Sequence, residues 1–294
     1  MELRHLRYFV ALAEELHFAR AAERLNIAPP TLTVQIQEIE RALSAKLFAR
    51  TKRSVALTPA GEAFLAEARN VLWSFEKART VGQRAGRGET GRIAVGYVGS
   101  AAYAGVLQEQ VRRFRQTWPD VDIHAREWPM DRLPELVAGG QIDVGFVRLP
   151  MALPRGLQLH VLLRDHFCLA LSSDHPLASS PDAVDPAGLA GEAFVTPEQV
   201  AGTYEVARRG RFTPRIISSP GSLLAVLAQV SLGSAVAIVP SVLREIVQMP
   251  NVVLRSLAGE PIGSEVAVVF RTSEPSPAAR NLIEQIRATQ PATV

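Results

Sequence analysis

The spacing of apolar residues changes at about residue 92, and this change constrains the fold more than any other feature of the sequence. Before residue 92, apolar residues recur every three or four positions, as they do in amphipathic helices. After it, short apolar runs alternate with helical segments, as in α/β domains. The 294 residues suffice for two or three domains. We therefore expect a mostly helical N-terminal part joined to an α/β C-terminal part.

Three helices are predicted in the first 43 residues. The first spans about Leu3 to Leu16, the second about Ala19 to Leu25, and the third ends near Leu43. Pro29 and Pro30 suit the first turn of the third helix, where a missing N–H is tolerated. The outer face of that helix is short and polar, as a face that reads base edges in a major groove must be. A solvated face of a small helical bundle fits the same pattern equally well.

The segment after the third helix favours DNA binding. Residues Phe48 to Leu57 predict two short strands around a turn that carries Arg50, Lys52 and Arg53. A basic hairpin beside a reading helix is a winged helix-turn-helix, whose wing contacts phosphates or the minor groove. The charge distribution agrees, because residues 1–92 hold 15 Lys and Arg against 10 Asp and Glu, whereas the remainder holds 17 against 19.

A long fourth helix is predicted to follow Thr58 and Pro59, which suit a helix cap and a first-turn proline. Its apolar residues repeat at heptad spacing, and so small a domain cannot bury the whole seam of so long a helix. We expect residues 59–85 to dimerise, since paired subunits match the symmetry of most operator DNA. Burial within a larger domain is the alternative. The seam consists of Phe64, Ala68, Val71, Phe75 and Ala78, widened by Leu65 and Leu72.

Four glycines after this helix, at positions 82, 86, 88 and 91, are interpreted as a hinge. Three of them match GxGxxG, but the order of helix then strand is the reverse of a dinucleotide site. The remaining chain predicts a parallel-rich α/β domain of two lobes, with crossings near Leu163 and Gly263. Strands are expected at 93–98, 121–127, 144–147, 157–163, 167–171, 194–196, 235–239 and 265–270, and helices at 105–117, 133–138, 222–232 and 277–288.

With these elements in order, the sequence resembles the LysR-type transcriptional regulators over essentially its full length. The N-terminal segment that resembles the family is MELRHLRYFVALAEELHFARAAERLNIAPPTLTVQIQEIERALSAKLFARTKRSVALTPAG. The later segments that do so are GRIAVGYVGSA, WPDVDI, GQIDVGFVRLP, SSDHPL and LGSAVAIVP. The resemblance implies a winged helix-turn-helix (1–58), a dimerisation helix with hinge (59–91) and a two-lobed effector domain like periplasmic binding proteins (92–294). Lobe I would be 92–163 with 265–294, and lobe II 164–264.

The resemblance also implies a function. Such a protein is a cytoplasmic homotetramer that binds promoter DNA, contacts RNA polymerase and responds to a small molecule held between the lobes. Two departures concern Pro29, where the family often has Gln, and Val34, where it often has Arg. Valine can pack on a thymine methyl but cannot hydrogen-bond guanine, so the base preference there differs. The expected DNA contacts are Pro30, Thr31, Thr33, Val34, Gln37, Arg50, Lys52 and Arg53.

The effector is expected at the carboxyl ends of the strands, near helix N-termini that attract anions. A free serine and arginine there favour a carboxylate effector, although Ser100 could serve only as a helix cap and Arg148 only in a surface ion pair. Pro129 replaces a hydroxyl residue of many relatives, which leaves the identity of the effector open. The expected effector contacts are Gly99, Ser100, Ala101, Trp128, Pro129, Arg148 and Thr196.

An enzyme and a free solute-binding module are the competing classes. The sequence has no GxSxG elbow, no P-loop and no lysine after Lys77, which argues against an enzyme. No catalytic residue, metal site or cofactor is predicted, because the histidines lack ligand spacing and identifiable carboxylate partners, and Cys168 suits a core thiol. We expect no export signal, and prolines and glycines interrupt the uncharged stretch 216–243, which argues against a membrane span.

Overall fold

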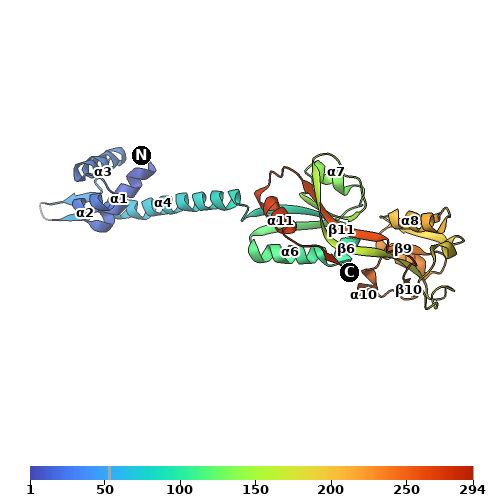
Figure 1. Cartoon of the computed structure of the whole chain (residues 1–294). Coiled ribbons are helices and arrows are strands. Elements are labelled where there is room, and N and C mark those ends of the chain that lie inside the picture. Colours follow the sequence, from blue (N-terminus) through green and yellow to red (C-terminus); the bar gives the residue numbers. More distant parts are fainter. Residues whose placement is uncertain (52–53, 294) are drawn as a thin grey trace. The chain divides into compact units, whose positions relative to one another are not determined.

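The structure is a computed structural model that describes residues 1–51 and 54–293. The chain forms two compact units, Met1–Arg84 and Ala85–Val294. Figure 1 colours them along the sequence, the first in blue and the second from cyan to red. Each unit has its own apolar core.

The first unit consists of three short helices, a two-stranded hairpin and most of one long helix. Its core centres on Phe9, whose ring lies 5.4 Å from that of Phe48 and 4.8 Å from that of Phe64. The elements are α1 (Leu3–Glu15), α2 (Phe18–Arg24), α3 (Pro29–Leu43), β1 (Phe48–Arg50), β2 (Val55–Leu57) and α4 (Pro59–Gly86).

The three predicted N-terminal helices are confirmed within a few residues at each end. Between α2 and α3 the chain turns through Asn26, whose φ is +52°, and α3 begins with the proline pair as predicted. Leu43 is exposed, because α3 ends there and Ser44 adopts a left-handed conformation that redirects the chain.

Helix α4 is 28 residues long, and its N-terminal half packs on its own unit. The Thr58 hydroxyl accepts a hydrogen bond from the Gly61 N–H at 3.0 Å, which confirms the predicted cap. Phe64 and Ala68 of the predicted dimer seam, and Leu65 and Leu72 that widen it, pack in the core of their own unit. The seam is therefore divided: its first half is intramolecular, and only its second half remains exposed. The exposed large apolar residues of α4 are Val71, Trp73, Phe75 and Val81.

The second unit is built on an eight-stranded sheet whose main path has the order β10-β6-β11-β5-β3-β4. We call the elements around the first core of this unit lobe I and those around its other two cores lobe II. Lobe I holds β3 (Gly91–Tyr97), α5 (Gly99–Tyr103), α6 (Val106–Thr117), β4 (Val121–Glu127), α7 (Leu133–Ala138), β5 (Val144–Leu149), β11 (Gly263–Arg271), α11 (Pro277–Arg287), β12 (Ala292–Thr293) and the start of β6 (Leu157–Ser172).

Lobe II is formed by the part of the chain between the two points where it passes from one lobe to the other. It contains the end of β6, on which β9 and β10 pair, and a separate parallel pair of strands, β7 and β8. Its other elements are η1 (Pro186–Leu189), β7 (Ala193–Pro197), α8 (Ala201–Gly210), β8 (Arg215–Gly221), α9 (Leu223–Ser231), β9 (Ala237–Pro240), α10 (Leu243–Ile246) and β10 (Val252–Arg255).

Two predictions about the sheet are wrong. The strands expected at 157–163 and 167–171 are one 16-residue strand, β6, because its backbone pairs with β11 as far as His166 and then directly with β9. The sheet is mixed rather than parallel-rich, since β11 runs antiparallel to both β5 and β6. Helix α8 and strands β8 and β10 were not predicted: the buried face of α8 contains Gly202 and Thr203 beside Val206 and Ala207, and neither strand contains a fully buried residue.

The uncharged stretch 216–243 folds as predicted, into helix α9 and strand β9 joined at Gly233, whose φ is +78°. Within residues 1–51 and 54–293 no helix combines the length and apolarity that crossing a membrane requires.

Candidate functional site

The outward face of α3 is available for contact with another molecule. Pro30, Thr31 and Gln37 are exposed, and Val34 exposes half of its surface although it is a large apolar residue. Thr33 is less available, because it is half-buried and its hydroxyl donates to the Pro29 carbonyl at 3.0 Å. Four of the five α3 residues expected to contact DNA therefore lie on its exposed face.

A buried carboxylate connects α3 to the wing. Glu40 accepts hydrogen bonds from the backbone N–H groups of Leu47 at 3.0 Å and Phe48 at 3.3 Å, and from Lys46 Nζ at 2.9 Å. Burial opposes its ionisation, but these donors and Arg50 together hold its pKa below the ordinary value. Glu40 thus fixes the position of the start of β1 relative to α3, a role that the sequence did not reveal.

The described part of the wing is a short antiparallel hairpin in which Phe48 pairs with Leu57. Arg50, an expected DNA contact, points back to its own unit: its guanidinium lies 3.8 Å from the Glu40 carboxylate and 4.7 Å over the Phe18 ring. Lys52 and Arg53, the other expected wing contacts, lie outside the described residues.

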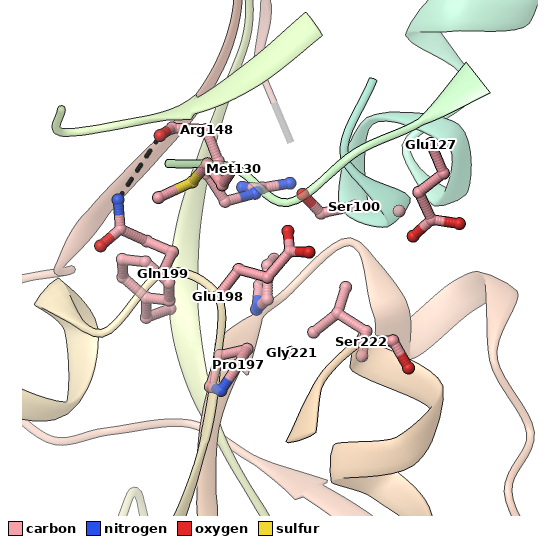
Figure 2. Close-up of a pocket in the computed structure, with 13 residues that line it drawn as sticks. Ser100, Glu127, Met130, Arg148, Pro197, Glu198, Gln199, Gly221 and Ser222 are labelled. Carbon is pink, nitrogen blue, oxygen red and sulfur yellow. Dashed lines mark hydrogen bonds between the residues drawn. The ribbon is translucent and has the colours of Figure 1, made fainter. Parts of the chain in front are cut away.

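A cleft in the second unit contains residues of both lobes (Figure 2). It has a narrow inner hollow of about 20 Å³ and a wide outer hollow of about 450 Å³. Five residues line both hollows, which makes them continuous: Glu127, Met130, Glu198, Gly221 and Ser222.

Arg148 lines the inner hollow and is 1% exposed. Its Nη1 donates to Ser264 Oγ at 2.5 Å and lies 3.4 Å from Asp165 Oδ2. Its Nε and Nη2 are buried and have no hydrogen-bond partner among the described residues. Burial lowers the pKa of Arg148 to about 10, while Asp165 opposes that shift, so the guanidinium is charged at neutral pH. Two charged donor groups therefore lack protein partners beside the inner hollow.

The surroundings of Arg148 also link the lobes. Asp165 lies on the crossing strand β6, and its carboxylate accepts hydrogen bonds from Ser241 Oγ and the Val242 N–H of lobe II. Gln199 of lobe II donates to the Arg148 carbonyl at 3.4 Å and to the Pro150 carbonyl at 2.8 Å. The alternative that Arg148 forms only a surface ion pair is therefore wrong, because its ion pair is buried.

Ser100 also lines the inner hollow and is buried. In the part of the chain that the structure describes, its hydroxyl makes no side-chain hydrogen bond, and Val98 rather than Ser100 occupies the N-cap of α5. The alternative role of Ser100 as a helix cap is thus wrong. Figure 2 shows Ser100, Arg148 and Glu198 around the same space.

The cleft has an acidic side that the sequence analysis missed. Glu127 ends β4, and Glu198 follows β7 in lobe II. Burial, reinforced by the charges of Glu127 and Asp131, raises the pKa of Glu198 to about 7. Raised carboxyl pKa values in a cleft mark candidate functional sites.

The expected effector contacts fall into three groups. Gly99, Ser100 and Arg148 line the inner hollow, and Trp128 and Pro129 line the outer hollow. The other two do not line either hollow: Ala101 packs in the lobe I core, and the Thr196 hydroxyl shares a hydrogen bond of 2.7 Å with Ser219. The cleft residues that the sequence analysis missed are Glu127, Met130, Asp131, Phe167, Pro197, Glu198, Gln199, Pro220, Gly221, Ser222, Leu223 and Pro240.

The histidines and the cysteine fall outside the cleft. Of the four histidines after residue 92, two do have carboxylate partners, contrary to expectation: His124 Nε2 lies 2.5 Å from Asp122 Oδ2, and His175 Nε2 lies 3.3 Å from Glu192 Oε1. Cys168 is buried as predicted, and burial raises the pKa of its thiol to about 11. The residues that the structure describes contain no group of three or more His, Cys, Asp or Glu that could hold a metal ion.

Two family models match the chain. Residues 3–62 match the bacterial regulatory helix-turn-helix protein, lysR family, and residues 86–291 match the LysR substrate binding domain. The first match covers the helix-turn-helix and the wing, and the second covers both lobes.

Individual relatives agree with these matches over nearly the whole chain. The HTH-type transcriptional regulator YnfL of Escherichia coli (strain K12) is 39% identical, with 96% of each protein aligned. The HTH-type transcriptional regulator AlsR of Bacillus subtilis (strain 168) is 33% identical over 96% of this chain and 94% of AlsR. The solved structure of full-length CbnR complexed with its target DNA is similar at a TM-score of 0.79 and 27% identity, covering 98% of this chain and 99% of CbnR. These relatives are transcription regulators rather than enzymes, and the chain therefore belongs to the LysR family of DNA-binding transcriptional regulators.

Proposed function

We propose that this regulator binds promoter DNA as a homo-oligomer through α3 and the wing, and that an anionic effector in the cleft changes that binding. The observation that carries the effector half is the unsatisfied guanidinium of Arg148, which lies beside the inner hollow. A buried charged donor without a partner costs free energy, and a carboxylate ligand removes that cost.

The DNA-binding half rests on the exposed face of α3 and on the position of the wing. Pro30, Thr31, Val34 and Gln37 would meet base edges and backbone in a major groove, and Lys52 and Arg53 would meet phosphates. Arg50 would position the wing more than it contacts phosphate, because Glu40 and Phe18 already engage its guanidinium. Val34 would pack on a thymine methyl, since it has no hydrogen-bonding group.

Oligomerisation is supported by the exposed apolar residues in the C-terminal half of α4. A soluble helix that exposes Val71, Phe75 and Val81 on one side can bury them against the same helix of a second subunit. A dimer built in this way would place two reading helices on two half-sites of a palindromic operator. We further propose a tetramer, a cytoplasmic location and a contact with RNA polymerase, as expected from the family resemblance.

An electrophoretic mobility shift with the DNA upstream of the protein's own gene tests the proposal. We expect binding at nanomolar to micromolar protein that weakens as salt rises, because Lys and Arg displace counterions from phosphates. An unrelated DNA of equal length is the control. Equal affinity for both DNAs would contradict specific promoter binding at this site.

A further inference from the structure

Three carboxylates converge on the wide part of the cleft. Glu127 and Asp131 come from lobe I, at the end of β4 and in the loop that follows, and Glu198 comes from lobe II. In the described ranges 1–51 and 54–293, none of the three has an ion pair or a side-chain hydrogen bond. The nearest cation along β4, Arg126, lies over the Trp128 ring at 4.2 Å and forms no ion pair with them. The acidic side of the cleft is therefore uncompensated by protein groups.

On the basic side of the same cleft, Asp165 offsets the charge of Arg148, but two donor groups of Arg148 lack partners among the described residues. Arg148 is buried, and its Nε and Nη2 have no partner, although its Nη1 contacts Ser264 and Asp165. No ion pair joins Arg148 to Glu127 or Glu198, so the opposite charges of the cleft do not neutralise one another. Figure 2 shows the Glu198 carboxylate and the Arg148 guanidinium on opposite sides of one space.

The two hollows differ in size and lining: the inner one reaches Arg148, the outer one reaches Asp131, and Glu127 and Glu198 line both. The inner hollow, beside Arg148 and Ser100, offers about 20 Å³, which is room for a group little larger than one water molecule. The outer hollow offers about 450 Å³, a volume typical of sites for small organic ligands. A small anionic group fits the inner end, and the body of the ligand then lies among Glu127, Asp131 and Glu198.

We propose that the effector is dipolar, with an anionic group bound by Arg148 and Ser100 and a protonated amino group bound by Glu198 and Glu127. The chemical class is that of amino acids and amino-substituted organic acids. This inference rests on the proposed effector function and specifies its ligand. A plain organic acid would place an uncharged body against three carboxylates, and a plain amine would leave the Arg148 donors without a partner.

The acidity of Glu198 agrees with this assignment. Its raised pKa shows that burial and its acidic neighbours disfavour the charged form in the unliganded cleft. A bound ammonium group would favour the charged form of Glu198. The positive charge of the ligand would then compensate carboxylates that have no protein cation beside them.

The test uses full-length protein and sets of three compounds, each a dipolar compound with its deaminated and its decarboxylated analogue. One set is L-phenylalanine, 3-phenylpropanoate and 2-phenylethylamine, and another is 5-aminopentanoate, pentanoate and butylamine. The remaining protein amino acids are compared with their deaminated and decarboxylated analogues in the same way. Calorimetric titration measures affinity. In at least one set the dipolar compound is expected to bind roughly ten- to a hundredfold more tightly than both analogues, the effect of losing one hydrogen bond to a charged group.

The variant Glu198→Gln tests the residue assignment, and Glu245→Gln, at an exposed position outside the cleft, is its control. Glu198→Gln is expected to weaken the dipolar ligand at least tenfold while leaving its deaminated analogue within about twofold, so the preference between them shrinks. The control is expected to change neither affinity. A Glu198→Gln variant that keeps the wild-type preference would overturn the inference.

Three further outcomes would also overturn it. These are equal or tighter binding of an acid or an amine than of the dipolar member in every set, no binding of any dipolar compound at millimolar concentration, and a larger thermal shift with magnesium or calcium chloride than with any organic compound. Failure of the proposed function is distinguishable, because it appears as absent specific promoter binding in the mobility shift. A plain acid that alters promoter binding would refute the dipolar ligand while supporting effector control.

Discussion

Glu198 is a single residue whose ionisation lowers the stability of its own domain. Its carboxyl is half-buried and lies near Glu127 and Asp131, and its pKa is about 7 rather than the ordinary 4.5. Because the folded protein holds this proton more tightly than the unfolded chain does, folding stability declines as pH rises from about 4.5 to about 7. Groups that lower stability in this way are expected where a ligand later compensates them.

Replacing this carboxyl should therefore stabilise the unliganded protein at high pH. Glu198→Gln is expected to raise the melting temperature at about pH 8, with the gain shrinking toward about pH 4.5, where wild-type Glu198 is also neutral. Thermal melts of both proteins across this pH range measure the effect. A variant that melts below wild type at every pH would show instead that the carboxylate stabilises the fold.

Single residues also show what the sequence could not reveal. Ser100 and Arg148 were predicted because they follow strand ends in an α/β pattern, and both line the cleft. Glu198 was missed although it lies two residues after Thr196, which was predicted. Strand alternation would place residues two positions apart on the same side, but Glu198 lies beyond the end of β7, where that rule no longer applies. The buried connection of Glu40 to the wing also depends on tertiary packing, which periodicity does not encode.

At the scale of elements, Glu40 fixes the orientation of the wing relative to α3. Glu40→Ala leaves the Leu47 and Phe48 N–H groups without their acceptor, which should lower the free energy of unfolding by about 1–3 kcal/mol. Urea denaturation measures this difference, and Glu23→Ala at an exposed position of α2 is the control. The Glu40 contribution should be present above about pH 4.5 and be lost as pH falls through its lowered pKa. Equal stability of Glu40→Ala and the control would contradict this role.

Helix α4 supplies the second prediction at this scale. Val71→Glu with Phe75→Glu is expected to break the proposed dimer, because like charges would meet across a two-fold axis in place of apolar contacts. Analytical ultracentrifugation detects the change in mass. Thr80→Glu is the control, since Thr80 lies on the opposite side of the helix from Val71 at 100° per residue. An unchanged assembly would show that this half of α4 does not hold the subunits together.

The elements themselves were predicted to differing extents. The N-terminal helices, the wing and most lobe I strands follow strong periodic patterns, and the structure contains them. Strand β6 was divided in two, because the polar residues around Asp165 interrupt its apolar pattern where it passes between the lobes. Its unbroken course depends on pairing with β11 and β9, which are distant in sequence.

At the scale of the whole molecule, the basic wing should contribute affinity without sequence preference. Arg53→Ala is expected to weaken binding to promoter and unrelated DNA alike and to lower the salt slope of log K by about one unit or less. Fluorescence anisotropy across a series of salt concentrations measures the slope. An unchanged affinity and slope would remove Arg53 from the DNA interface.

The central claim is that a ligand in the cleft controls DNA binding, and Ser100→Ala tests it most directly. Ser100 lines the inner hollow and caps no helix, so its replacement should leave the melting temperature and the promoter affinity of the unliganded protein unchanged. Promoter affinity is measured by anisotropy for wild type and Ser100→Ala, with and without the compound that binds the wild type in calorimetry. We predict that the compound changes the promoter affinity of wild type, and that Ser100→Ala requires roughly ten- to a hundredfold more of it. An identical ligand response in the two proteins would contradict the account.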